Sequence, residues 1–193
     1  MTVAARRTAS TDDRDELDEL TLRRAQRGEA AAWRALVDRY QRPVFALISR
    51  MLGPGRRGQV EDLAQETFLQ VVRSLERFSH DGPARLSTWI LTIAARRAVD
   101  HLRRRELPTA DAERLVGGEG GAAALHRAQV GAAIQRAVAD LSPEYRAAFL
   151  LREYHGLDYG EIATALRIDL GTVKSRLSRA AARVRGSLGE VPA

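Results

Sequence analysis

Residues 158–180 read DYGEIATALRIDLGTVKSRLSRA, and this stretch decides the fold of the C-terminal part of the chain. Asp158 and Glu161 stand three residues apart, which is the spacing of a capping box at a helix start. After a tight turn, Asp169 can cap a second helix over 170–187. Two short helices joined by a tight turn predict a helix-turn-helix.

The second of these helices has two chemically different faces. Val173, Leu177, Ala180 and Val184 recur on one side at helical spacing and are expected to face the preceding helices. The other side presents the polar and basic residues Thr172, Ser175, Arg176, Arg179 and Arg183, and Lys174 completes the candidate DNA-binding set. A DNA major groove admits such a helix, and its basic groups can bind guanine edges or phosphates. A merely solvated charged face is the alternative, and the single sign of the charge weighs against it.

Upstream, the apolar spacing predicts two more helices. One contains Val130, Ile134, Val138 and Leu141, and the next begins at Ser142-Pro143, an N-cap followed by proline at the first helical position, and stops by Gly156. Residues 106–126 differ in composition, with Pro108 and a Gly-rich cluster at 117–121, and they predict a flexible linker. The cluster lacks the Gly-Lys-Ser/Thr ending of a phosphate-binding loop.

The N-terminal half is also predicted to be helical. Residues 1–20 form an acidic extension, and a domain is expected over 21–105. Its helices are a run to Met51 that Pro43 should kink or divide, a second starting near Glu61, and a third over 86–105. With 127–188 as the other domain, the fold class is all-α: two helical domains on a linker.

Composition limits the function. The net charge is +6 and the calculated pI about 10.6, so a polyanion is the expected partner. Lys174 is the sole lysine, a bias toward arginine that a GC-rich genome would also produce. The chain has no cysteine, which excludes thiolate catalysis and thiolate zinc sites. No signal peptide or membrane span is expected, and these features predict a cytoplasmic protein.

The C-terminal motifs resemble a known family. The strings LSPEYR (141–146), LLREYHGLDY (150–159), EIA (161–163) and GTVKSRLSRA (171–180) resemble the promoter-binding C-terminal domain of extracytoplasmic-function (ECF) sigma factors of the sigma-70 family. This resemblance implies that the C-terminal helix binds the duplex −35 element. Taken alone, these strings would leave response-regulator output domains as an alternative.

The N-terminal half carries two further resemblances. DLAQETF (62–68) is similar to the motif with which sigma factors bind the clamp helices of RNA polymerase. Asp62, Gln65 and Glu66 share one exposed helix face, so they can meet basic groups, and Phe68 belongs to the same candidate surface. An ordinary acidic helix start is the alternative reading of this segment.

LSTWILTIA (86–94), continuing to DHLRRR (100–105), resembles the helix that binds the melted −10 element. Such binding needs cationic groups and aromatic or arginine planes. The candidate residues are Trp89, Arg96, Arg97, Asp100, Arg103 and Arg104. Trp89 could serve either core packing or strand separation. Two positions depart from the family: Arg96 stands where Asn is usual, and Arg167 where many members have Gly.

The resemblance implies a transcription initiation factor whose partners are core RNA polymerase, promoter DNA and an anti-sigma factor, with no cofactor, metal or small-molecule substrate. An enzyme is not expected, because the histidines are scattered and no hydrolase or metalloprotease motif occurs. A DNA-binding regulator that acts without polymerase is the main alternative. It would explain the C-terminal domain but neither the 62–68 motif nor the second basic helix.

Overall fold

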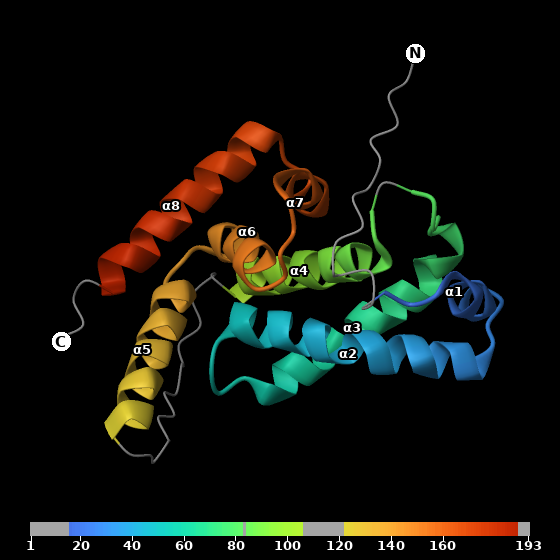
Figure 1. The fold of residues 1–193 in the computed structure, drawn as a ribbon, viewed down its shortest axis with the longest axis horizontal. Coiled ribbons are helices and arrows are strands. Elements are labelled where there is room, and N and C mark those ends of the chain that lie inside the picture. The colour runs from blue at the N-terminus through green and yellow to red at the C-terminus, as the bar shows by residue number, and fades with distance from the viewer. Residues whose placement is uncertain (1–15, 83, 106–121, 189–193) are drawn as a thin grey trace.

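The computed structural model describes residues 16–82, 84–105 and 122–188. Within these ranges the chain is helical, and they contain no strand. The N-terminal part holds α1 (Glu19–Gln26), α2 (Ala30–Leu52), α3 (Arg57–Ser74), the 3-10 turn η2 (Leu75–Arg77) and α4 (Leu86–Arg105). The C-terminal part holds α5 (Ala122–Ala139), α6 (Pro143–Glu153), α7 (Tyr159–Leu166) and α8 (Leu170–Leu188) (Figure 1).

The predicted all-α fold of two helical domains is therefore confirmed. Most of the predicted linker lies outside the described residues, and residues 122–126, which were expected to belong to it, are the first part of α5. Residues 1–15 of the predicted acidic extension also lie outside the described residues.

Pro43 does not divide α2, contrary to one of the two sequence-based expectations. Proline removes one backbone hydrogen bond, but the buried stripe of the helix continues on both sides of it. Tyr40 precedes Pro43 and Val44 follows it, and both side chains are buried. The helix ends at Gly53, whose φ of 83° needs a residue without a Cβ.

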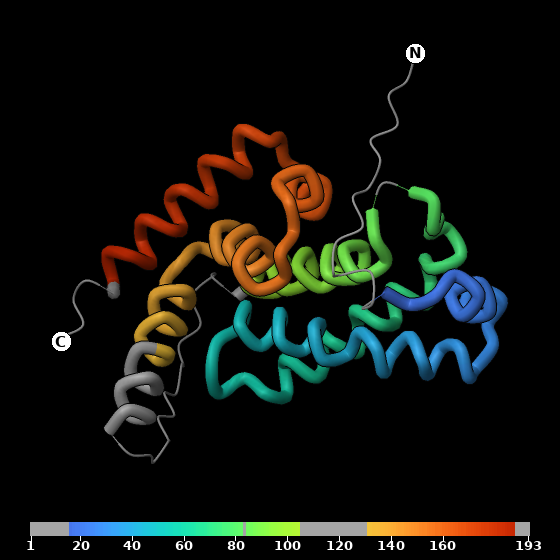
Figure 2. Tube along the Cα trace, in the orientation of Figure 1, coloured from blue at the N-terminus to red at the C-terminus, as the bar shows by residue number. Residues whose placement is uncertain are grey.

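Helix α4 is the central element of the molecule. It packs against α2 and α3 of its own domain and against α6 and α7 of the other domain, and Figure 2 shows its path between these two groups. Its buried residues accordingly lie on several sides of the helix: Leu86, Thr88, Ile90, Leu91, Thr92, Ala94, Ala95, Ala98 and Leu102. One helix therefore contributes to the cores of both domains.

Arg146 links the C-terminal domain to the end of α2 through hydrogen bonds. Its side chain is only 8% exposed, and it donates hydrogen bonds to Val138 O (3.1 Å), Leu141 O (2.9 Å), Ala139 O and Met51 O. The carbonyls of Val138 and Ala139 lie in the last turn of α5, that of Leu141 lies in the turn after it, and that of Met51 lies in the last turn of α2. Helix C-termini carry partial negative charge and carbonyls without helical partners, so they suit a buried guanidinium.

The end of α6 also rests on α2. The guanidinium of Arg50 lies 4.5 Å from the centre of the Tyr154 ring. The neighbouring His155 is largely withdrawn from water, and this burial, with the charge of Arg50 as a second cause, lowers its pKa to about 4. Within the described part of the chain, its Nε2 is the buried side-chain polar atom without a hydrogen-bond partner.

We expect acidification to destabilise this packing through His155. A solvated histidine takes up its proton at a pH of about 6.5. The folded protein resists protonation down to about 4, so the unfolded state binds more protons between these values. The free energy of unfolding should therefore fall as the pH drops from about 6.5 to about 4, with a contribution of His155 on the order of 2 to 3 kcal/mol.

Urea unfolding across this pH range measures the effect. His155→Phe should weaken the pH dependence of the free energy of unfolding, whereas His80→Phe, at an exposed position, should leave that dependence unchanged. Equal pH dependence in wild type and His155→Phe would contradict this role of His155.

Candidate nucleic-acid interface

The helix-turn-helix begins with a complete capping box on α7. Oδ1 of Asp158 accepts the backbone N–H of Glu161 at 2.8 Å, and Oε2 of Glu161 accepts the backbone N–H of Asp158 at 2.8 Å. These reciprocal bonds satisfy donors that a helix start leaves without partners. The capping box predicted from the sequence is confirmed.

The turn between α7 and α8 contains one residue with left-handed backbone angles and ends at a second helix N-cap. Arg167 has φ 54° and ψ 50°, a conformation that disfavours a residue with a Cβ. Asp169 then accepts from the backbone N–H (2.8 Å) and the hydroxyl (2.6 Å) of Thr172, which lowers the pKa of its carboxyl group. A Cβ at Gly171 would lie 3.0 Å from Oδ1 of Asp169, so glycine leaves room for the cap.

The two faces of α8 lie as the sequence predicted. Val173, Leu177, Ala180 and Val184 are buried against the neighbouring helices. Of the candidate DNA-binding residues, Thr172 and Arg176 are half-buried, and the exposed ones are Lys174, Ser175, Arg179 and Arg183. The exposed charged groups of this set, Lys174, Arg179 and Arg183, are therefore all positive.

Tyr145 on α6 holds two of these arginines, a role that the sequence analysis did not assign to it. Nη1 of Arg179 donates to its phenol oxygen at 3.2 Å, and the guanidinium of Arg183 lies 5.8 Å from its ring centre. The hydrogen bond from Arg179, followed by the charges of Arg179, Arg183 and Arg176, lowers the pKa of the phenol. Both arginines are thereby oriented along the exposed side of α8.

On α4, the candidate residues are spread around the helix. Trp89 is half-buried, and its ring packs on Phe78 with the ring centres 5.2 Å apart. Arg97 forms an ion pair with Glu66 of α3 at 2.7 Å, and Arg103 forms one with Glu144 of α6 at 3.2 Å. Asp100 and Arg104 are exposed.

Arg96 is directed at the other domain. Its Nε donates to the carbonyl of Ala165 at 2.6 Å, and its Nη2 donates to the carbonyl of Thr164 at 2.8 Å, both in the last turn of α7. Burial, with the nearby charge of Arg167 as a smaller cause, lowers the pKa of Arg96. Arg96 and Arg167, the two positions that differ from the pattern of the family that the sequence resembles, thus lie close enough to influence each other electrostatically.

The acidic motif of α3 forms an exposed face. Asp62, Gln65 and Glu66 all reach solvent, as their spacing predicted. Phe68 instead lies half-buried against the core. The exposed apolar residues of this helix are Leu69 and Val72, with relative exposures of 47% and 50%, and the sequence analysis did not identify them.

Glu16, near the end of the acidic extension, contacts the start of α4. Its carboxylate accepts from the hydroxyl and the backbone N–H of Ser87, and from the hydroxyl of Tyr40 at 3.0 Å. Tyr40 also accepts the backbone N–H of Leu17 at 3.0 Å. Nothing in the sequence pattern identified this contact, because it joins segments that lie far apart in the chain.

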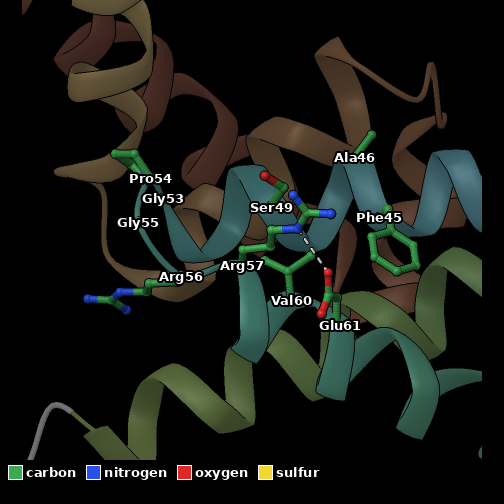
Figure 3. A pocket seen from close by; sticks show the side chains of 10 residues that line it. All are labelled: Phe45, Ala46, Ser49, Gly53, Pro54, Gly55, Arg56, Arg57, Val60 and Glu61. Carbon is green, nitrogen blue, oxygen red and sulfur yellow. Dashed lines mark hydrogen bonds and ion pairs between the residues drawn. The ribbon is translucent and has the colours of Figure 1, made fainter. Parts of the chain in front are cut away.

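An open hollow of about 500 Å³ lies where α2 turns into α3 (Figure 3). Phe45 and Val60 line it together with the Gly53–Gly55 turn, and an ion pair of 3.0 Å joins Arg57 to Glu61 at its side. None of the residues assigned to DNA or polymerase binding lines it. Across the residues that the structure describes, no cluster of His, Cys, Asp or Glu could hold a metal ion, and no helix has the length and apolarity to cross a membrane.

Comparison with known families assigns both halves of the chain. The model for Sigma-70 region 2 matches residues 36–107, and the model for Sigma-70, region 4 matches residues 131–184. The chain is 33% identical over 178 residues to the RNA polymerase sigma-H factor of Pseudomonas aeruginosa, covering 86% of this chain and 90% of that protein. It is 32% identical over 176 residues to the ECF RNA polymerase sigma-E factor of Escherichia coli strain K12, covering 84% and 90%.

Two solved structures share the fold. One is CnrH in complex with the cytosolic domain of CnrY, with a TM-score of 0.65 and 23% identity, covering 91% of this chain and 99% of that one. The other is the sigma factor RpoE in complex with the anti-sigma factor NepR from Bartonella quintana, with a TM-score of 0.63 and 20% identity, covering 82% and 98%.

The conformation of Arg167 predicts a stabilising substitution. A residue with a Cβ is strained in the left-handed region, by about 1 kcal/mol or more. Arg167→Gly relieves this strain but adds conformational freedom to the unfolded chain, so we expect a net gain of up to ~1 kcal/mol in the free energy of unfolding. Urea unfolding at constant pH measures it. Arg34→Gly, at an exposed position within the right-handed helix α2, should destabilise by about 1 kcal/mol, and a loss of similar size in Arg167→Gly would contradict the strain.

Two of the tyrosines should ionise in a defined order. The chain has four, and the environment lowers the pKa of Tyr145, whereas burial and the nearby Glu16 raise that of Tyr40. On raising the pH, Tyr145 should form its phenolate before Tyr40 does. Tyr145→Phe should remove absorbance from the early part of the titration, and Tyr40→Phe should remove it from the late part. An unchanged early part of the titration in Tyr145→Phe would show that Arg179 and Arg183 do not act on this phenol.

Proposed function

The chain belongs to the ECF group of the sigma-70 family, and we propose that it binds core RNA polymerase and directs it to specific promoters. The observation that carries this proposal is the presence of two different surfaces in one chain. The basic face of α8 suits DNA, and the acidic and apolar face of α3 suits a protein. A stand-alone regulator would need only the first of them.

The C-terminal domain reads the duplex −35 element. The capped start of α8 brings Thr172 and Ser175 to the end of the helix that enters the major groove. Arg176, Arg179 and Arg183 continue the row along the helix, and Lys174 adds a charge beside it. Arginine is suited to both roles here, because its planar fork pairs with guanine edges and with phosphates.

The N-terminal domain holds the melted −10 element along α4. Arg97, Arg103 and Arg104 supply positive charge for the strand, with Arg96 after its release from α7. Asp100 lies between them and can accept from base amino groups. Trp89, supported by Phe78, contributes an aromatic edge at the start of the helix.

Core polymerase binds the outer face of α3. Asp62, Gln65 and Glu66 provide the polar contacts, and the ion pair with Arg97 places Glu66 next to the DNA-binding helix. The exposed Leu69 and Val72 extend this surface with apolar area of the kind that interface centres contain. Phe68 supports the surface from inside rather than contacting the partner directly.

The remaining partners follow from the same assignment. The protein acts in the cytoplasm, where RNA polymerase works, and it carries out no covalent chemistry itself. We expect an anti-sigma factor to regulate it by covering these surfaces. The RpoE structure, which shares the fold of this chain, is a complex of a sigma factor with the anti-sigma factor NepR, and this pairing supports the expectation.

Reversing the charge at Asp62 should weaken polymerase binding and preserve the fold. The side chain is exposed, so Asp62→Arg changes the surface without disturbing the core. We expect at least a tenfold loss of affinity for bacterial core RNA polymerase, measured by fluorescence anisotropy of labelled protein. Asp38→Arg, an exposed position on α2 with the same change of charge, is the control. Equal binding by Asp62→Arg and wild type would refute the α3 assignment. Absence of polymerase binding by folded wild-type protein that still binds duplex DNA would establish a stand-alone regulator.

Removing the side chain of Arg176 should weaken promoter binding by the assembled polymerase. A base-contacting arginine contributes about 1 to 3 kcal/mol, so Arg176→Ala should bind promoter duplex roughly ten- to a hundredfold more weakly. A gel-shift titration against a promoter selected from a random duplex pool measures this. Arg34→Ala, exposed on α2, loses the same charge and should bind like wild type. Wild-type affinity of Arg176→Ala for the promoter duplex would show that Arg176 does not contact the bases.

A further inference from the structure

An aromatic pair stands at the start of α4, where the proposed function places the melted strand. The rings of Phe78 and Trp89 pack with their centres 5.2 Å apart and their planes inclined by 44°. Both side chains are half-buried against the core, so part of each reaches solvent. Phe78 directly follows η2, and Trp89 lies in the first turn of α4. The position of the pair therefore depends on how these two backbone segments are held.

Gln26, at the end of α1, holds the backbone on the Phe78 side. Its Nε2 donates to the carbonyl of Leu75 at 3.0 Å and to the carbonyl of Phe78 at 2.8 Å. The Leu75 carbonyl also accepts the backbone N–H of Phe78, which closes η2. The amide of Gln26 thus bridges the two ends of this short turn, and it fixes the direction in which the chain leaves the turn toward α4.

Glu16, which precedes α1, holds the backbone on the Trp89 side. Its carboxylate accepts from the backbone N–H and the hydroxyl of Ser87 in the first turn of α4, and from the hydroxyl of Tyr40 on α2. A helix start leaves its first N–H groups without helical partners. Arg85 stands at the N-cap position, since its carbonyl accepts the N–H of Trp89, but a guanidinium has no acceptor with which to cap a helix. Glu16 supplies that acceptor from 71 residues away.

Both holding residues belong to the segment 16–26, which lies outside the residues matched by the region 2 model. That match covers 36–107 and includes both members of the aromatic pair. Tyr40 joins the two parts, because its hydroxyl donates to Glu16 and accepts the backbone N–H of Leu17. Its side chain is only 3% exposed, so the joint is anchored in the core. Residues 16–26 thus form an N-terminal brace that holds the supports of the pair from two sides.

We propose that Glu16 and Gln26 are positioning residues for promoter melting, because the N-terminal brace sets the position of the Phe78–Trp89 pair. This inference rests on the proposed function, which places Trp89 at the melted −10 element. A base that leaves the duplex loses its stacking partner, and an aromatic ring replaces that partner only where it is already held in place. Glu16 and Gln26 act through Ser87 and the carbonyls of η2, and not by contact with the DNA.

Two substitutions release the pair by different chemistry. Gln26→Glu replaces the amide donor with a carboxylate, which repels the two carbonyls of η2, and Gln41→Glu is its control, with the same change of charge at a half-buried position of α2. Glu16→Ala removes the acceptor at the start of α4, and Glu19→Ala is its control, because it removes an exposed carboxylate of the same segment. None of these four residues belongs to the proposed DNA-binding or polymerase-binding sets.

The first measurement is the fluorescence of Trp89 in the free protein. The chain has two tryptophans, so Trp33→Phe leaves Trp89 as the sole emitter. In this background, Gln26→Glu and Glu16→Ala should each shift the emission to longer wavelength and increase its quenching by acrylamide, because a released ring is more exposed to water. The two controls should match the background. Unchanged emission and quenching in either variant would overturn the positioning role of the residue it replaces.

The second measurement is promoter melting by the holoenzyme assembled with bacterial core RNA polymerase. It is followed by 2-aminopurine fluorescence in the −10 element of a promoter selected from a random duplex pool. Gln26→Glu and Glu16→Ala should open this promoter roughly threefold more slowly than their controls, which is the scale of one lost hydrogen bond. Both should bind core polymerase like wild type, which excludes a general loss of folding.

Coupling to Trp89 separates positioning from a merely structural role. In a Trp89→Ala background, Gln26→Glu and Glu16→Ala should slow opening no further, because residues that act through one partner are not additive. Equal slowing with and without Trp89 would show that the effects bypass the pair, and would refute the proposal.

Failure of this inference is distinguishable from failure of the sigma-factor assignment. The fluorescence of the free protein does not depend on polymerase, and the Asp62→Arg experiment tests polymerase binding separately. A holoenzyme that carries a released Trp89 and still opens the promoter at the control rate would exclude the melting role, and would leave the assignment of the chain as a sigma factor intact.

Discussion

Guanidinium groups that donate to the ends of helices hold this molecule together. Arg146 joins the C-termini of α5 and α2, and Arg96 binds the C-terminus of α7. Removing a guanidinium from water is expensive unless its donors are satisfied. The last carbonyls of a helix satisfy them, because these groups lack helical partners and carry partial negative charge. The positions of the two domains therefore depend on the matching of arginine side chains to helix ends.

The surfaces proposed for function follow from this arrangement. Helix α4 is buried from several sides, so its neighbours determine which of its residues reach solvent. On α3, the inward turn of Phe68 leaves Leu69 and Val72 outside, beside the carboxylates. On α8, the buried stripe fixes the rotation of the helix, and Tyr145 orients the arginines on the opposite side. In each case the packing determines which face of the helix is exposed to solvent, and the residues on that face determine what it can bind.

Local features of the fold could be predicted from the sequence, and contacts between distant segments could not. The capping box of Asp158 and Glu161, the cap at Asp169 and the bounds of α4 depend on neighbours in the chain, and all were predicted correctly. Division of the helix at Pro43, one of the two effects expected there, does not occur, because burial of the flanking residues outweighs the lost hydrogen bond. The partners of Arg96 and Glu16 lie 69 and 71 residues away, so no local pattern indicates them.

The acceptors of Arg96 have a consequence for how this contact evolves. Arg96 binds backbone carbonyls of Thr164 and Ala165, not their side chains. Any residue at those two positions supplies the same oxygen atoms as long as α7 ends in the same place. Pairs of positions that change together across homologues reveal contacts between side chains, and this contact would leave no such trace. Mutational screens would show the same asymmetry. Substitutions of Arg96 break the contact, whereas substitutions of Thr164 and Ala165 keep the acceptor oxygens and leave it intact.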